Sequence, residues 1–214
     1  AICQACFDVP KLRNEVYCQV IKLTTNFPEP GSPLNLNHWY LLGSLCSSFL
    51  PSRKFVRFLR FHLRRTTEQF ETNGDDVVAA AQFCLDALKK TKLRDFPPST
   101  AEVRGIMNGT GLECKVYCVG GKVIPVKISS SSTCADVLKD VKAQLKLQHC
   151  SNGFGLFETC GVVDKYLEEK SIVADVYSKW EKYEAHQIGD TDAWKLVFKL
   201  FSFFCIKFGH LISV

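Results

Sequence analysis

The spacing of apolar residues changes once along this chain, near residue 110, and the change divides the sequence into two kinds of structure. Up to about Met107 apolar residues recur every three or four positions, which is typical of helices. From Leu112 they alternate with polar residues, which is typical of strands with one buried face. We therefore expect a multidomain protein, with an all-α helical bundle followed by an α+β unit, and a boundary within 108–112.

Several helices are expected in the first half, separated by segments that cannot continue a helix. The segment NFPEPGSP contains three prolines and a glycine, and FPPS contains two further prolines, so both should be loops. Ser99 and Glu102 have the spacing of a capping box. The helices are expected at 11–25, 36–49, 53–65, 75–91 and 99–107.

The second half has the element order of a ubiquitin-like roll. Two alternating stretches, 112–117 and 123–128, flank Gly120-Gly121 and predict a β-hairpin. Ser132 or Thr133 should cap a helix, and further strands are expected at 154–157 and 194–200. The expected helix presents apolar residues at helical spacing, namely Val137, Leu138, Val141 and Leu145.

A basic segment lies within the third expected helix. The chain has no Asp or Glu between Pro30 and Thr67, and the end of this interval is rich in cations. At about 100° per residue, four of the arginines project from one narrow stripe, while the apolar residues spread over the remaining, mostly opposite faces. The pattern predicts a surface for an acidic, extended partner, although a solvated basic face with no partner remains the alternative. The candidate binding residues are Arg53, Lys54, Arg57, Arg60, Arg64 and Arg65.

The cysteines and the catalytic motifs give little indication of chemistry. Eleven cysteines are scattered singly through apolar stretches, as expected for small buried residues in a reducing cytosol. Cys3 and Cys6 have the spacing of half a zinc site, but no second pair lies at a suitable distance. Phosphate-loop, serine-elbow and zinc-protease motifs are missing from the sequence. We therefore expect no enzyme activity, no metal and no cofactor.

The C-terminal stretch from Trp194 to Val214 is apolar enough to raise the question of a membrane span. Lys195, Lys199 and Lys207 interrupt this stretch, and a charge at the centre of a spanning helix costs about 2.5–3.5 kcal/mol. The alternation from Trp194 to Leu200 fits a strand better than a transmembrane helix.

Long segments of both halves of the sequence carry a family resemblance. In the helical half these segments are LRNEVYCQVIKLTTN, HWYLLGSLCSSFLPSRKFVRFLRFHLRR and FPPSTAEVRGIM, and together they resemble the myosin tail homology 4 (MyTH4) domain. The stretch from Cys114 to Phe204, with GFGLFE, VADVYSKWE and WKLVFKLFSFF, is similar to the first, ubiquitin-like lobe of a FERM domain. This tandem is characteristic of the tails of unconventional myosins and of pleckstrin-homology relatives that lack a motor.

The resemblance implies a domain plan and a departure from the family pattern. Residues 1–110 should be the MyTH4 domain, 111–204 the FERM lobe and 205–214 a divergent tail. The chain is expected to lack early helices of the first domain and the later FERM lobes. Missing early helices should leave an apolar row exposed on the first expected helix, formed by Leu12, Val16, Val20 and Leu23.

The resemblance also implies a cytoplasmic, cytoskeleton-associated adaptor. It would bind microtubules or another acidic cytoskeletal surface, and cargo or receptor tails in the full-length parent; any motor ATPase would lie outside this chain. The same cations could instead bind anionic lipid at a membrane surface, at about 1 kcal/mol per basic residue. Insertion is not expected, because the apolar residues beside the stripe are predicted to face the core. Nucleic-acid binding is not expected either, because no aromatic residue is interleaved on the charged stripe for base stacking.

Overall fold

A computed structural model describes residues 1–25, 29–68, 74–148, 153–161, 163–185 and 194–201. The chain forms two compact units, the first from Ala1 to Gly111 and the second from Leu112 onward. Each has its own hydrophobic core, and each is described by itself below.

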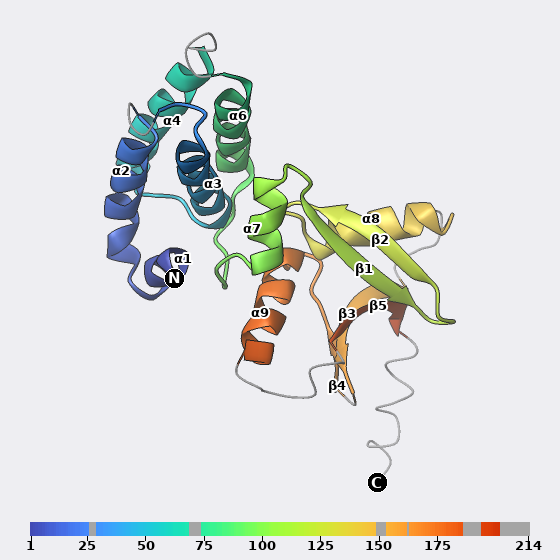
Figure 1. Cartoon of the computed structure of the whole chain (residues 1–214). Helices are drawn as coiled ribbons and strands as arrows, with labels where there is room; N and C mark the ends of the chain where they lie inside the picture. The colour runs from blue at the N-terminus through green and yellow to red at the C-terminus, as the bar shows by residue number, and fades with distance from the viewer. Residues whose placement is uncertain (26–28, 69–73, 149–152, 162, 186–193, 202–214) are drawn as a thin grey trace. The chain divides into compact units, whose positions relative to one another are not determined.

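The first unit is a helical bundle built around one buried helix (Figure 1). This helix, α3, contacts α1, α2, α6 and α7, while α4 packs against α6 and α2. The bounds of the elements are α1 Ile2–Asp8, the 3-10 turn η1 Pro10–Leu12, α2 Arg13–Leu23, α3 Pro33–Ser48, α4 Arg53–Glu68, α6 Asp75–Lys90 and α7 Thr100–Met107.

Helix α3 is buried nearly all round, as its sequence predicts. Ser32 caps it by accepting a hydrogen bond from the backbone N–H of Asn35 (3.3 Å), and Pro33 occupies the first turn. Trp39 and Phe49, each 1% exposed, are among the largest side chains in the core of the unit. The Tyr17 hydroxyl donates to the carbonyl of Phe49 (2.7 Å), so α2 is tied to the end of α3.

The capping box expected at 99–102 forms only in part. The Ser99 hydroxyl accepts from the backbone N–H of Glu102 (3.2 Å) and caps α7. The Glu102 carboxylate, however, pairs with Arg94 at 2.6 Å, and both side chains are almost completely buried. Because a buried guanidinium needs a charged acceptor, the ion pair takes the carboxylate that a capping box would use.

The second unit is a mixed five-stranded sheet in the order β2-β1-β5-β3-β4. Strand β5 is parallel to β1 and antiparallel to β3, and the other pairs are antiparallel. The hairpin register pairs Cys114 with Val126 around the turn at Gly120 and Gly121, both of which have positive φ. The strands are β1 Leu112–Cys118, β2 Val123–Ile128, β3 Phe154–Cys160, β4 Val163–Tyr166 and β5 Lys195–Leu200.

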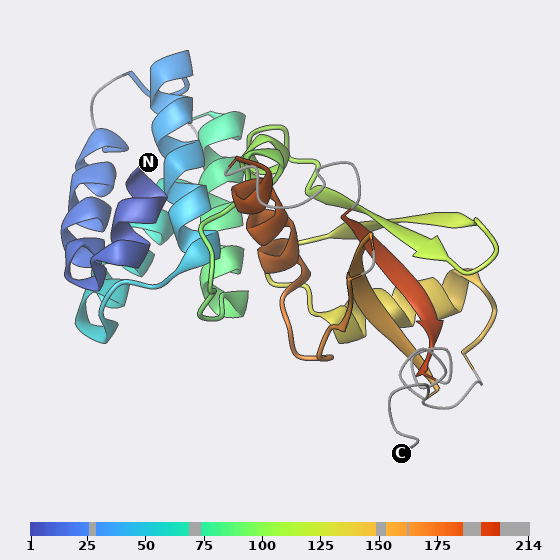
Figure 2. The same cartoon turned by 90° about the horizontal axis from the view of Figure 1, so that it is seen from below.

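Helix α8 (Cys134–Gln144) lies across one face of this sheet (Figure 2). Thr133 caps it in a complete capping box with Asp136. Val137, Leu138 and Val141 are buried against the sheet, as their spacing predicts. The hairpin, the helix and the late strand therefore confirm the ubiquitin-like arrangement.

Some elements differ from the sequence expectations. Helix α1, strand β4 and helix α9 (Val173–Ala185) are not among the elements predicted from periodicity. Of the apolar row expected to be exposed, Val20 is buried and Val16 is half-buried, whereas Leu12 in η1 and Leu23 in α2 are each 41% exposed. The tail expected at 205–214 and its boundary at 204 lie outside the described residues. Across the part of the chain that is described, no helix is both long and apolar enough to span a bilayer.

Candidate binding surface on helix α4

Helix α4 is held in place by contacts along its buried side. Leu59 and Leu63 are fully buried in the core of the helical unit. At its start, the backbone N–H of Ser52 donates to Asn14 Oδ1 (2.8 Å), which ties the beginning of α4 to α2. The exposed side of α4 is therefore presented by a fixed helix.

His62 joins α4 to two neighbouring helices. Its ring stacks on Trp39 of α3 (centroids 5.5 Å apart, planes 4° apart), and its Nε2 lies 3.0 Å from the hydroxyl of Thr24. Burial, with a further contribution from Arg65, lowers the pKa of His62 from 6.5 to about 4. The imidazole is therefore neutral near pH 7 and acts as part of the core.

All six candidate cations are exposed, and the four stripe arginines lie in a sector about 60° wide. Within the described ranges, none of them forms an ion pair with a carboxylate. Arg53 and Lys54 stand in the first turn, where no acid accompanies them and where the helix dipole disfavours positive charge by about 0.3–1 kcal/mol each. Arg53 and Lys54 therefore do not stabilise α4 through the helix dipole, and binding of an acidic partner is a better reason for their presence.

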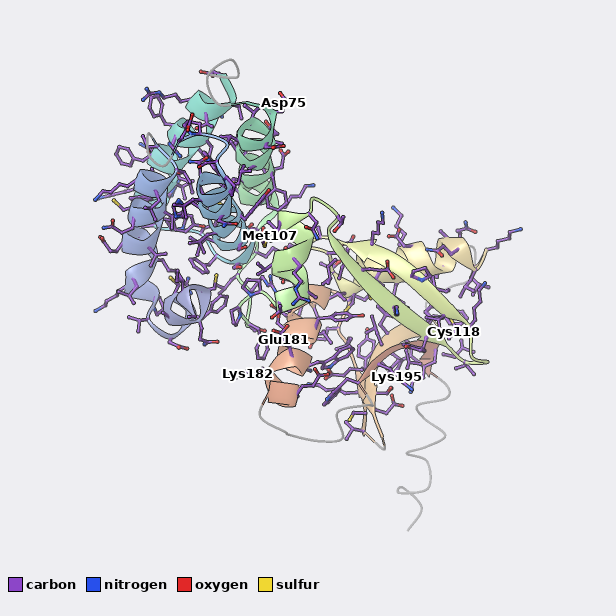
Figure 3. All side chains as sticks on the ribbon, in the orientation of Figure 1. Asp75, Met107, Cys118, Glu181, Lys182 and Lys195 are labelled. Carbon is purple, nitrogen blue, oxygen red and sulfur yellow. The ribbon has the colours of Figure 1, made fainter. Side chains whose placement is uncertain are left out.

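Two phenylalanines expected in the core are instead exposed on α4. Phe58 is 70% exposed and Phe61 is 67% exposed. Both lie among cations on the helix surface, so the expectation that every apolar residue beside the stripe faces the core is wrong. Neither ring lies on the arginine stripe itself, so the expectation that the stripe carries no aromatic residue for base stacking is not contradicted. Figure 3 shows side chains along α4 extending outward from the helical unit.

A hollow of about 240 Å³ lies elsewhere in the helical unit, between α3, α6 and α7. Met107, which marks the end of α7 in Figure 3, lines it together with Trp39, Phe83 and Asp76. It is smaller than the ~300–1,000 Å³ typical of ligand sites, and Asp76 is the one acid among its lining residues. It has no set of groups suited to catalysis.

One buried carboxylate of the sheet unit has a clear structural role. In the sheet unit, the Glu158 carboxylate binds Lys179 and accepts a hydrogen bond from Trp180 Nε1 (3.2 Å), which fixes α9 to β3.

Burial raises the pKa of Cys3 and of Cys114 to about 11, so these thiols are protonated at neutral pH and are weak nucleophiles. Among the described residues, no three His, Cys, Asp or Glu side chains are placed to hold a metal ion.

Two family models match the chain in sequence order. The MyTH4 domain model matches residues 1–105, and the RA-like domain model matches residues 110–202. Domains of this kind are non-catalytic adaptor modules, in agreement with the expectation that the chain is not an enzyme.

Curated relatives match nearly the whole chain but extend far beyond it. Pleckstrin homology domain-containing family H member 3 from Homo sapiens is 30% identical over 209 residues, covering 93% of this chain and 26% of the relative. Myosin-I heavy chain from Dictyostelium discoideum is 27% identical over 201 residues, covering 92% of this chain and 8% of the relative. The chain thus spans about a quarter or less of the length of these two proteins.

Solved structures show the same fold. The MyTH4-FERM MF1 domain of Dictyostelium discoideum Myosin VII has a TM-score of 0.84 and 26% identity, with 93% of this chain and 40% of that chain covered. The C-terminal MyTH4-FERM domain of human Myosin 7b, solved with the harmonin-a PDZ3 domain, has a TM-score of 0.69 and 19% identity. The match covers 92% of this chain and 39% of that chain. The chain is therefore a MyTH4 domain followed by an RA-like lobe of the FERM type, in the order of the MyTH4-FERM tail modules of unconventional myosins.

Proposed function

We propose that this chain is a cytoskeletal adaptor module that binds microtubules, or another acidic cytoskeletal surface, through the arginine stripe of α4. The stripe consists of Arg53, Arg57, Arg60 and Arg64, and Lys54 and Arg65 flank it. The module would be cytoplasmic and associated with the cytoskeleton. In a longer parent protein it would also take part in binding cargo or receptor tails, just as the Myosin 7b module was solved with a PDZ domain.

The observation that carries this proposal is the run of exposed cations on α4, none of which is ion-paired within the part of the chain that the structure describes. Residues 53–68 contain six cations and a single acid, Glu68. Clustered charge of one sign attracts an oppositely charged partner and accelerates association at low ionic strength. The stripe follows the helix axis for about 17 Å, since its ends are eleven residues apart at 1.5 Å per residue. A row of this length suits an extended acidic surface better than a small anion.

The test is co-sedimentation of the chain with microtubules. Arg57 and Arg60 lie near the centre of the stripe, and both are exposed. The double variant Arg57→Glu/Arg60→Glu should bind much more weakly and retain the circular dichroism spectrum of the wild type. Wild-type binding should fall steeply as salt is raised, because surface charges are screened within about 8–10 Å at physiological ionic strength.

A matched control reverses two exposed cations outside α4, as in Lys89→Glu/Lys90→Glu at the end of α6. This control should leave microtubule binding nearly unchanged. If the Arg57/Arg60 variant co-sediments as well as the wild type, the stripe is not the binding surface.

A further inference from the structure

We propose that a second face of α4, next to the arginine stripe, docks on anionic lipid bilayers by inserting two phenylalanine rings. This aromatic face consists of Lys54, Phe58, Phe61 and Arg65. The inference concerns a different partner and an adjoining surface, which shares only Lys54 and Arg65 with the cations of the proposed microtubule interaction, and it does not depend on that interaction.

The helical positions separate the two faces. At about 100° per residue, the four residues of the aromatic face lie within a sector about 60° wide, centred roughly 100° from the centre of the arginine stripe. Phe58 and Phe61 are neighbours at a spacing of three residues. Lys54 precedes Phe58 by one turn, and Arg65 follows Phe61 by one turn. Each ring is therefore bracketed by a cation along the helix.

Exposure makes these two rings unusual for the chain. At 70% and 67% exposed, Phe58 and Phe61 are the two phenylalanines that stand furthest out of the surface among the described residues. The Phe58 ring lies beside Phe55 (centroids 6.3 Å apart), which is half-buried and joins the aromatic face to the core. Leu59 and Leu63 already fill the buried side of α4, so the helix needs neither Phe58 nor Phe61 for its packing.

The charge around the rings indicates which partner they fit. An interfacial helix binds a membrane by burying apolar side chains at the boundary of the acyl chains while basic residues meet anionic headgroups. The aromatic face has this arrangement, and no acid accompanies it before Glu68 at the end of α4. The hollow described above is lined by no α4 residue, so the two rings lie outside it.

Flotation of the chain with lipid vesicles tests this inference. The wild type should bind phosphatidylcholine vesicles that contain phosphatidylserine and should bind pure phosphatidylcholine vesicles far more weakly. The variant Phe58→Ser/Phe61→Ser keeps every cation, yet its affinity should fall roughly a hundredfold, since burial of each of the two rings is worth a factor of about ten. A control, Leu93→Ser, removes an apolar residue that is 76% exposed outside α4 and should bind like the wild type.

A second measurement reports insertion directly. In the variant Phe61→Trp, the added indole fluorescence should shift to shorter wavelength on anionic vesicles and be quenched by brominated acyl chains, whereas the wild-type spectrum should change little. Equal vesicle binding by the wild type and Phe58→Ser/Phe61→Ser would show attraction by charge alone and overturn the inference. Absence of wild-type binding to anionic vesicles would also overturn it and would leave the rings as anchors for a protein partner.

Discussion

His62 is a titratable residue used as a core residue. It stacks on Trp39 and lies within hydrogen-bond distance of Thr24, so one imidazole connects α4, α3 and the end of α2. Protonation would place a charge in this partly desolvated position, close to Arg65. The stability of the helical unit is therefore linked to the neutral state of this side chain.

The first prediction concerns this linkage. The pKa of His62 is lowered on folding from 6.5 to about 4, so between these values the unfolded chain binds more protons. Stability contributed by neutral His62 is complete above pH 6.5 and is lost as pH falls toward 4, by at most about 3 kcal/mol. Urea unfolding at several pH values should show this slope in the wild type. His62→Gln should reduce the slope, and an identical slope in both proteins would contradict the assignment.

The exposed rings show what residue patterns can and cannot indicate. The basic stripe follows from charge and helical spacing, and the six candidate residues are indeed exposed. Phe58 and Phe61 could not be placed from sequence, because apolar residues occur on almost every side of α4 and periodicity does not show which of them the neighbouring helices cover. Glu102 illustrates the same difficulty, since its partner Arg94 lies in a loop and not in the capping motif.

At the scale of an element, α7 depends on a close approach of its own C-terminal loop. A Cβ added to Gly105 would lie 2.2 Å from the carbonyl oxygen of Gly111. The backbone N–H of Thr110 donates to the carbonyl of Gly105 (3.0 Å), which holds the loop in this position. Position 105 therefore requires glycine because any side chain would collide with the backbone of Gly111, and not because the φ angle of Gly105 is unusual.

Gly105→Ala should destabilise the helical unit by about 1–3 kcal/mol, because a methyl group would have to push backbone aside. Arg104→Ala is a suitable control, since Arg104 is exposed on the same helix. Thermal unfolding should show a lower midpoint for the Gly105 variant and little change for the control. Equal midpoints would mean that the loop can move away without cost.

Elements were predictable where their patterns are long. Helices α2, α3, α4, α6 and α7 and the hairpin have several repeats or a diagnostic turn, and they lie close to their expected bounds. Helix α1, of seven residues, was not expected. Strand β4 has only four residues, and a pattern of this length does not stand out from chance. Its position is fixed by pairing with β3, for example Phe157 with Tyr166, and such long-range pairing is not encoded locally.

At the scale of the whole molecule, two separate cores predict two separable unfolding events. Leu138 is 6% exposed in the core of the sheet unit. Leu138→Asp would bury an unpaired carboxylate there at a cost of several kcal/mol, and should unfold this unit while the helical unit persists. Circular dichroism should retain a cooperative helical transition in this variant. Lys139→Asp, at the adjacent exposed position, should behave like the wild type, and collapse of both units in the Leu138 variant would contradict independence.

The placement of both candidate faces on a single helix has a geometric consequence. A microtubule wall and a bilayer are each far wider than a helix of about 10–12 Å diameter, so each acts as a plane touching a thin cylinder. If the microtubule wall touched α4 along the arginine stripe and the bilayer touched it along the aromatic face, the two contact lines would lie roughly 100° apart around the helix. Two wide surfaces placed in this way would overlap in space close to the helix. One copy of the module could then bind either surface but not both at once, so the two partners would compete for it.

Anionic vesicles added to the microtubule-bound chain should release the chain from the microtubules, whereas release should be much weaker for Phe58→Ser/Phe61→Ser. Vesicles recovered with the chain in the microtubule pellet would instead show that one copy binds both surfaces.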